Sequence, residues 1–201
     1  MQSHTPLSNA LTTNEMVSQV TPLDALRVGR RLWLDCERIH MSALASELGI
    51  NRATLFRWVG NKDLFTGEVI WSFYMESLEK IRDEATFEGA SYLVFVCEQL
   101  VSRMMKSRPL HHFISQDPEY AIRILASKDS VVQARSINAI EGLMTEQEEK
   151  GTWQPPLPIK DLAYLTVRIA ESFLYGEVIS DQEPGISHIG KAFRLILADR
   201  R

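Results

Sequence analysis

Residues 41–65 carry two short helical patterns that meet at Gly49, and this spacing restricts the fold more than any other feature of the chain. Leu44 and Ala45 fall on one face of the first pattern, and Ala45 is small enough for a second helix to cross closely. Gly49 supplies the left-handed turn that other residues adopt only at a cost. Asn51 can then cap the second helix by accepting a backbone N–H. The segment therefore predicts a helix-turn-helix, whose second helix typically enters the major groove of DNA.

The second helix of this pair, expected over about residues 52–58, has its polar side chains facing outward. Leu55 faces inward together with Trp58 or Val59. A helix hairpin alone is common in helical proteins, but here the apolar spacing, the caps and the outward cations occur together. We therefore favour DNA binding over an incidental hairpin.

The outward residues suit different parts of a DNA duplex. Arg52 and Arg57 are the expected base readers, because a guanidinium can pair with guanine in bidentate fashion. Ala53 can make an apolar contact with a thymine methyl group. Asn51 and Thr54 lie near the helix N-terminus, where the helix dipole favours anions, so they suit phosphate contacts.

About residues 22–80 resemble the N-terminal part of the TetR family of bacterial transcriptional repressors. The family signature reads approximately L-A-x-x-x-G-V-S-x-x-T-L-Y-x-x-F-x-x-K. The stretch W-V-G-N-K-D and the overall layout also resemble QsdR-type members, which are associated with quorum-signal lactone degradation genes. The matching residues here are Leu44, Ala45, Gly49, Ile50, Asn51, Thr54, Leu55, Phe56, Val59 and Lys62.

The resemblance implies further contacts and two departures. Lys62 resembles the phosphate-contacting lysine of the family. Phe56 stands where the family usually has Tyr, so it can pack or touch a sugar but lacks the hydroxyl that contacts phosphate. His40 stands where the family often has Thr. The N-terminal cap of the helix that begins at about residue 41 therefore falls to His40 or Ser42.

Helical periodicity along the whole chain, without an alternating strand pattern or a nucleotide-binding glycine loop, predicts an all-α protein. We expect a flexible N-terminal tail at 1–21, which has no Lys or Arg. A helix-turn-helix DNA-binding domain with a connecting helix follows at 22–82. Its first helix is expected from Pro22 to about Arg38, with Ile39 partly buried at its end. A larger helical domain for ligand sensing and dimerisation occupies 83–201.

The charge distribution fits this division. The chain has a net charge of −4, yet residues 22–62 hold seven Lys or Arg against four Asp or Glu. Residues 83–201 hold thirteen Lys or Arg against seventeen acids. A cationic DNA-binding end on an acidic body is consistent with DNA contact by the first domain alone.

The chain shows no sign of a membrane or an oxidising compartment. There is no apolar run long enough to span a bilayer, and the N-terminus lacks the pattern of a signal peptide. The two cysteines, Cys36 and Cys97, are far apart and lack metal-like spacing. We expect a cytoplasmic protein without a disulfide framework, a metal site or a cofactor.

The resemblance implies a small-molecule effector in the larger domain. An apolar helix near residues 90–105 offers part of a pocket, and aromatic and polar residues farther along the chain can close it. Aromatic residues and methionines at helical spacing are more often part of the core than of a pocket. The polar groups of the Tyr, Gln, Trp and His side chains nevertheless suit a mostly apolar ligand such as an acyl or lactone compound. The candidates are Tyr92, Phe95, Val96, Gln99, Met104, His111, Phe113, Trp153, Phe173 and Tyr175.

One short reading helix makes too few contacts for specific binding, so we expect a homodimer on a near-palindromic operator. The last two predicted helices, from Pro158 to about Ser180 and from Ile186 to about Arg200, carry apolar faces that can form a four-helix interface. The same faces can instead complete the core of a single subunit. The candidates are Leu162, Leu165, Ile169, Phe173, Ile189, Phe193 and Leu197.

Two other functions remain open from the sequence. One is a DNA-binding regulator that has no small-molecule ligand and is controlled by a partner protein. The other, more remote, is a hydrolase of a small apolar substrate. Two sets of residues are its candidates for catalysis: His111 and His112 with Asp117, or Cys97 with a histidine. Adjacent histidines on a helix point about 100° apart, and Cys97 lies in an apolar run, so we expect no enzyme.

Overall fold

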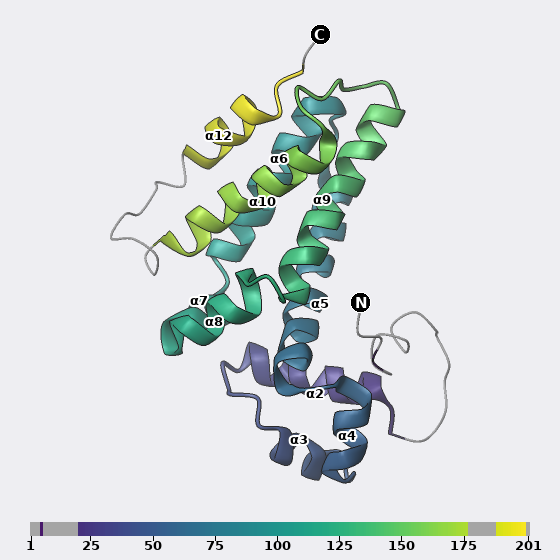
Figure 1. The fold of residues 1–201 in the computed structure, drawn as a ribbon, viewed down its shortest axis with the longest axis vertical. Coiled ribbons are helices and arrows are strands. Elements are labelled where there is room, and N and C mark those ends of the chain that lie inside the picture. The colour runs from purple at the N-terminus through teal and green to yellow at the C-terminus, as the bar shows by residue number, and fades with distance from the viewer. Residues whose placement is uncertain (1–4, 6–19, 177–187, 200–201) are drawn as a thin grey trace. The chain divides into compact units, whose positions relative to one another are not determined.

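The computed structural model describes residue 5, residues 20–176 and residues 188–199, and every regular element in this part of the chain is an α-helix. This agrees with the predicted all-α fold. Contacts divide the chain into two compact units, which we call unit 1 (residues 1–72) and unit 2 (residues 73–201). The division falls inside one long helix, α5 (Lys62–Glu84), which contributes to both units (Figure 1).

Unit 1 contains α2 (Pro22–Leu34), α3 (Met41–Glu47), α4 (Arg52–Val59) and the first part of α5. Asp24 stabilises the start of α2: its carboxylate accepts hydrogen bonds from the backbone N–H and the hydroxyl of Thr21, both at 2.7 Å. Such reciprocal contacts satisfy donors that a helix start leaves unpaired.

The first helix ends earlier than the sequence predicts. We expected it to reach about residue 38, but α2 ends at Leu34. Cys36 adopts a left-handed backbone conformation with φ of 59°, which a helix interior does not allow. Ile39 lies beyond this break and is still buried, so an apolar residue that looked helical packs from a connecting segment.

Unit 1 has one compact apolar core. A Cβ atom at Gly29 of α2 would come within 2.7 Å of side-chain atoms of Phe65 and Val69 of α5, so the two helices pack at close range. The core side chains that fill the space between the four helices are Ala25, Leu26, Trp33, Leu44, Ala45, Leu55, Val59, Phe65 and Val69.

Unit 2 combines the second part of α5 with α6 (Gly89–Met105), α7 (Arg108–Gln116), α8 (Pro118–Ala126), α9 (Val131–Glu149), α10 (Ile159–Leu174) and α12 (Ile189–Ile196). Helices α9 and α10 pack along each other, and α12 packs on α6 and α10 (Figure 1). Side chains of Ser107, Asp117 and Ser130 cap α7, α8 and α9.

A buried polar contact ties the start of α6 to the end of α9. The side-chain oxygen of Gln147, which is 2 % exposed, accepts hydrogen bonds from the Gly89 backbone N–H at 2.8 Å and the Thr152 hydroxyl at 3.1 Å. Gly89 has φ of 62°, and a Cβ there would lie 2.4 Å from the Thr152 carbonyl oxygen. Both the conformation and the space therefore require glycine at this helix start.

Two sequence expectations fall partly outside the described residues. The predicted tail, 1–21, is described only at its residues 5, 20 and 21. The predicted helix over 158–180 is observed as α10, which ends at Leu174, and its last predicted residues are not described. None of the described helices combines the length and apolar character that crossing a bilayer requires.

Candidate nucleic-acid interface and candidate ligand cavity

Helices α3 and α4 form the predicted helix-turn-helix. Gly49 has φ of 65°, and the N–H of Ile50 donates to the Ala45 carbonyl at 3.0 Å, which closes the end of α3. The Asn51 side-chain oxygen accepts a 2.7 Å hydrogen bond from the Thr54 N–H at the start of α4. Leu55 is fully buried, so the opposite face of α4 points away from the core of unit 1.

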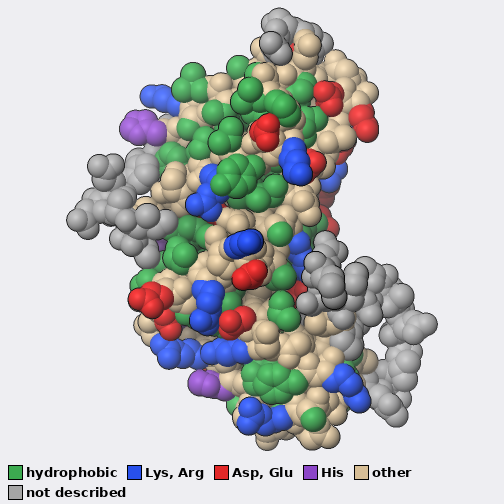
Figure 2. Space-filling model, in the orientation of Figure 1, with side chains coloured by type: hydrophobic (Ala, Val, Ile, Leu, Met, Phe, Trp, Pro, Cys, Tyr) green, Lys and Arg blue, Asp and Glu red, His purple; other side chains and the backbone are tan. Residues whose placement is uncertain are grey.

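The predicted DNA-contacting residues share that outward face or flank it. Arg52, Ala53 and Arg57 are exposed, and Thr54 and Phe56 are half-buried. Figure 2 shows several Lys and Arg side chains on the visible surface of unit 1, with a few acidic side chains beside them. The face is polar and cationic, as a phosphate-lined groove requires.

The two arginines of α4 differ in their surroundings. The Arg52 guanidinium lies over the Phe56 ring, 5.7 Å from its centroid, so that the ring supports the cation. This contact gives Phe56 a role that its missing hydroxyl does not affect. Arg57 makes no ion pair within the described part of the chain, and its guanidinium is available to a partner.

Asn51 and Lys62 occupy the starts of two successive helices. Because Asn51 uses its side-chain oxygen as the cap, its amide nitrogen is the group that can donate to a phosphate. The Asn61 side chain caps α5 by accepting from the Leu64 N–H at 2.8 Å, and half-buried Lys62 is the first residue of that helix. The structure thus brings all seven predicted residues to α4 and the start of α5.

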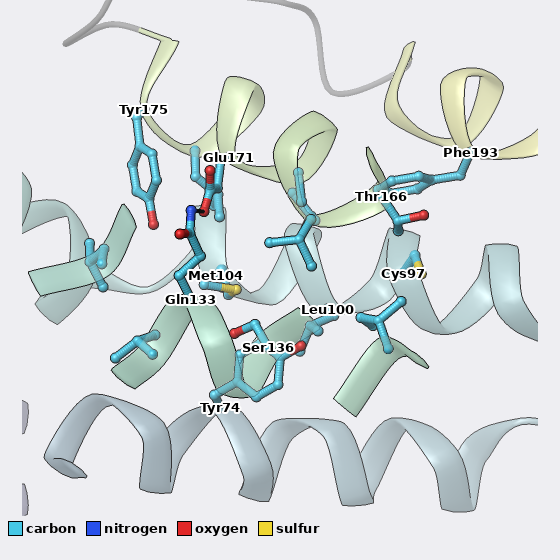
Figure 3. Close-up of a pocket in the computed structure, with 17 residues that line it drawn as sticks. Tyr74, Cys97, Leu100, Met104, Gln133, Ser136, Thr166, Glu171, Tyr175 and Phe193 are labelled. Carbon is cyan, nitrogen blue, oxygen red and sulfur yellow. Dashed lines mark hydrogen bonds between the residues drawn. The ribbon is translucent and has the colours of Figure 1, made fainter. Parts of the chain in front are cut away.

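Unit 2 contains a partly enclosed cavity of about 50 Å³ between α5, α6, α8, α9, α10 and α12 (Figure 3). Most of its wall is apolar, as in sites for mostly apolar ligands, although a space of this volume must widen to admit an acyl compound. The apolar residues that line it include Leu100, Val101, Met104, Leu125, Val132, Ile140, Val167, Leu174 and Phe193.

Several polar side chains also line this first cavity. Glu171 of α10 is 7 % exposed, and one of its carboxylate oxygens accepts a 3.0 Å hydrogen bond from the Gln133 side-chain nitrogen. The other oxygen lies 2.5 Å from a guanidinium nitrogen of Arg168, as an ion-pair contact without hydrogen-bond geometry. Burial raises the pKa of the Glu171 carboxyl, whereas Gln133 and Arg168 oppose that rise.

Thr166 has a buried hydroxyl on the same wall. Its side-chain oxygen has no hydrogen-bond partner within the described residues, and the residue is only 2 % exposed. Burying a hydroxyl without a partner is unfavourable, so such groups in native proteins often mark sites that a ligand or a water completes.

A second cavity of about 90 Å³ lies beside the first, between α6, α7 and α10. Met104 and Leu174 line both cavities, so their side chains form the wall between them. Methionine is flexible and adapts to irregular spaces. A change of Met104 rotamer can therefore connect the two spaces.

The ten predicted ligand residues are distributed unevenly. Met104 and Tyr175 line the first cavity, and His111 and Phe173 line the second together with Met104. Phe95 lines a surface groove between α6 and α12, where it also contacts the ring of Phe87. The remaining five line none of these three spaces: Tyr92, Val96, Gln99, Phe113 and Trp153.

Trp153 illustrates why an aromatic residue in a loop misled the prediction. It is 2 % exposed, and its indole N–H donates to the Leu197 carbonyl at 3.1 Å. Its role is to fasten the loop after α9 to the end of α12. Phe113 packs edge-on against Tyr120, with ring centroids 5.7 Å apart.

The sequence reasoning missed five polar or aromatic residues of the first cavity: Tyr74, Gln133, Ser136, Thr166 and Glu171. A signal was present, because Gln133 and Ser136 are three residues apart on the same face of α9 as Ile140. A polar residue within an apolar helix face is an informative exception, whereas an aromatic residue there is common in a packed core.

The predicted dimer residues fall into two classes. Leu162, Ile189, Phe193 and Leu197 are at most 1 % exposed and pack inside the subunit, so they offer no surface to a partner. Leu165 is 39 % exposed, and Ile169 and Phe173 are half-buried. Two large residues that we did not predict, Tyr164 of α10 and Leu195 of α12, are 51 % and 80 % exposed.

Comparison with known proteins identifies the larger part of the chain. Residues 88–198 match the family described as Tetracyclin repressor-like, C-terminal domain. No curated protein matches the chain.

Solved structures match the fold over nearly the whole chain. The transcriptional repressor QsdR of the TetR family from R. erythropolis is 26 % identical, with a TM-score of 0.80 over 90 % of this chain and 95 % of that chain. The fatty acid degradation regulator FadR from Bacillus halodurans is 15 % identical, with a TM-score of 0.54 over 90 % and 96 % of the two chains, and it supports the fold alone. The chain belongs to the TetR family of DNA-binding transcriptional regulators.

Proposed function

We propose that this protein is a ligand-responsive repressor that binds a near-palindromic operator as a homodimer and releases it when a small, largely apolar effector binds. The observation that carries the DNA-binding part is the exposed face of α4, where Arg52, Ala53 and Arg57 point away from the core of unit 1. The similarity to a TetR-family repressor, QsdR, supports repression as the outcome.

The cavity in unit 2 supports the effector part of the proposal. It is partly enclosed and mostly apolar, and it carries a few polar side chains, which is the usual composition of a small-molecule site. For such a ligand to release DNA, it must bind more tightly to the state of the dimer that cannot span the operator. Acyl and lactone compounds fit the mixture of apolar wall and polar groups.

Dimerisation is proposed through α10 and α12, where Tyr164, Leu165 and Leu195 are exposed. A dimer places two reading helices at about the 34–36 Å repeat of the duplex. A bacterial repressor of this kind acts on the chromosome, so we place it in the cytoplasm.

The site chemistry favours a binding protein over a hydrolase. Burial raises the pKa of the Cys97 thiol to about 12, so the thiolate that nucleophilic catalysis needs is scarce. Among the described residues, no three His, Cys, Asp or Glu side chains gather as a metal site would require. TetR-family regulators are in general transcription factors without enzymatic activity, which fits this reading.

The proposal is tested by selecting bound sequences from a random duplex pool and then titrating the complex with acyl and lactone compounds. We expect an enriched inverted repeat and an increase in dissociation, read by fluorescence anisotropy. Enrichment without any ligand response would favour the partner-controlled regulator. An absence of enrichment would overturn the DNA-binding role.

A further inference from the structure

The one charged side chain among the described residues that line the first cavity lies at one end, together with two other polar side chains. In Figure 3, Glu171, Gln133 and Tyr175 lie together, whereas Phe193, Cys97 and Leu100 lie toward the other end. A ligand in this space therefore meets a carboxylate and an amide at one end, and mainly apolar side chains with the Thr166 hydroxyl at the other. This asymmetry sets the orientation of an amphiphilic molecule.

The hydrogen-bonding capacity of the polar end is dominated by acceptors. An ionised carboxylate offers about four lone-pair sites and no donor. In Glu171, Gln133 occupies one site by donating to one oxygen at 3.0 Å, and the other oxygen has only the ion-pair contact with Arg168. Acceptor capacity therefore remains at a carboxylate that lines the cavity.

The cation that balances Glu171 approaches from outside. Arg168 does not line the cavity, and its side chain is 45 % exposed. Among the described residues that line this cavity there is no Lys, Arg or His. A carboxylate on the ligand would thus be buried beside a like charge without a cation of its own, which is costly.

We infer that the Glu171 end of the first cavity selects an effector whose uncharged head group carries an N–H or O–H donor, and that it rejects a carboxylate head. The inference rests on the proposed effector function and specifies its ligand class. The apolar tail of the effector runs from this end toward Leu100 and Phe193, past the Thr166 hydroxyl.

The hydroxyl of Thr166 adds a second, weaker determinant. It is buried on the cavity wall without a partner in the described chain, and it can donate to or accept from a polar atom farther along the ligand. An amide or hydroxyl group within an acyl compound has both kinds of atom. A plain hydrocarbon would leave both Thr166 and Glu171 unsatisfied.

Three probes of equal chain length separate these possibilities: hexanamide, methyl hexanoate and hexanoate. Binding to the full-length protein is measured by isothermal titration calorimetry, and operator release by fluorescence anisotropy. We expect hexanamide to bind about 10- to 100-fold more tightly than methyl hexanoate, because a hydrogen bond to a charged group contributes at that scale. Hexanoate is expected to bind most weakly.

The matched variants are Glu171→Gln, which keeps the shape of the side chain, and Glu148→Gln, which changes an exposed glutamate on α9. Glu171→Gln removes the like charge, so it should lower the ratio of the hexanamide affinity to the hexanoate affinity, and Glu148→Gln should leave this ratio unchanged. If Glu171→Gln does not fold, the three affinities of the natural protein still decide the inference.

Two results would overturn the inference, and they differ in what they leave standing. If hexanoate binds the natural protein as tightly as hexanamide, the selection by Glu171 is wrong while the effector cavity remains. If none of the probes binds although operator DNA still does, both the head-group selection and the effector role of this cavity are wrong, and DNA binding remains.

Discussion

At the scale of single residues, a substitution of Arg57 tests whether α4 contacts the bases of the operator. Its guanidinium is exposed on α4 and has no ion pair in the described chain, so Arg57→Ala should remove a base contact without disturbing the core of unit 1. We expect a loss of ~1–3 kcal/mol in operator affinity and relaxed preference at one base pair. The measurement is anisotropy on the operator and on single-base variants of it.

The control for Arg57 is Arg108→Ala, which removes an exposed cation from α7. It should leave the affinity unchanged. Lys62→Ala should weaken binding to all duplexes alike and reduce the slope of affinity against salt by about one. If Arg57→Ala binds every operator variant as the natural protein does, α4 does not read the bases.

Thr166 gives a second prediction at this scale. Thr166→Val replaces a buried hydroxyl that lacks a partner by a methyl group of similar shape. Because an unsatisfied buried hydroxyl costs about 1–3 kcal/mol, the ligand-free variant should be more stable by up to about that amount. Urea denaturation measures the free energy of unfolding, and a loss of stability would show that the hydroxyl has a partner in solution.

At the scale of helices and turns, features that depend on residues close together in sequence were predicted better than features that depend on tertiary packing. The turn at Gly49, the cap at Asn51 and the inward position of Leu55 depend on neighbours in sequence, and the structure has all three. The end of α2 was misplaced because Ile39 continues an apolar pattern although Cys36 breaks the helix.

The cavity could not be predicted in the same way, because its wall comes from six helices. Aromatic residues such as Trp153 and Tyr92 attracted attention as ligand contacts, yet they fill the core. The residues that give the cavity its chemistry, Glu171 and Thr166, each look like an ordinary position on an amphipathic helix. Only the packing of α9 against α10 brings Gln133 to Glu171, across 38 positions of sequence.

The wall between the two cavities yields a prediction about α6. Met104 lines both spaces, so Met104→Ala should join them, and the variant should prefer octanamide over hexanamide more strongly than the natural protein does. Met105→Ala is the matched control, because Met105 lines the second cavity alone. Calorimetric titration gives both affinities, and equal shifts in the two variants would contradict a dividing role for Met104.

At the scale of the whole molecule, the exposed apolar side chains of α10 and α12 predict the dimer interface. Leu165→Asp and Leu195→Asp each place a charge on this surface, so either should weaken the dimer and with it the affinity for a two-site operator. Leu157→Asp is the control, because Leu157 is 50 % exposed in the loop before α10. Sedimentation equilibrium measures the dimer dissociation constant.

The dimer prediction has a clear negative outcome. If Leu157→Asp weakens the dimer as much as the two helix variants do, the interface lies elsewhere. The seam predicted from sequence included Phe193 and Leu197, which are fully buried in the subunit, because spacing alone does not tell which side of an amphipathic helix its own core occupies.

The position of Cys97 has a practical consequence. Cys97 lines the first cavity and is 3 % exposed, whereas Cys36 of unit 1 is half-buried and does not line that cavity. Alkylation of Cys97 therefore requires unit 2 to open locally. The rate of alkylation of Cys97 relative to that of Cys36 reports how often this opening occurs. A compound that occupies the cavity should slow the alkylation of Cys97 and leave that of Cys36 unchanged. Mass spectrometry of the untagged, unmutated protein can therefore screen for the natural effector.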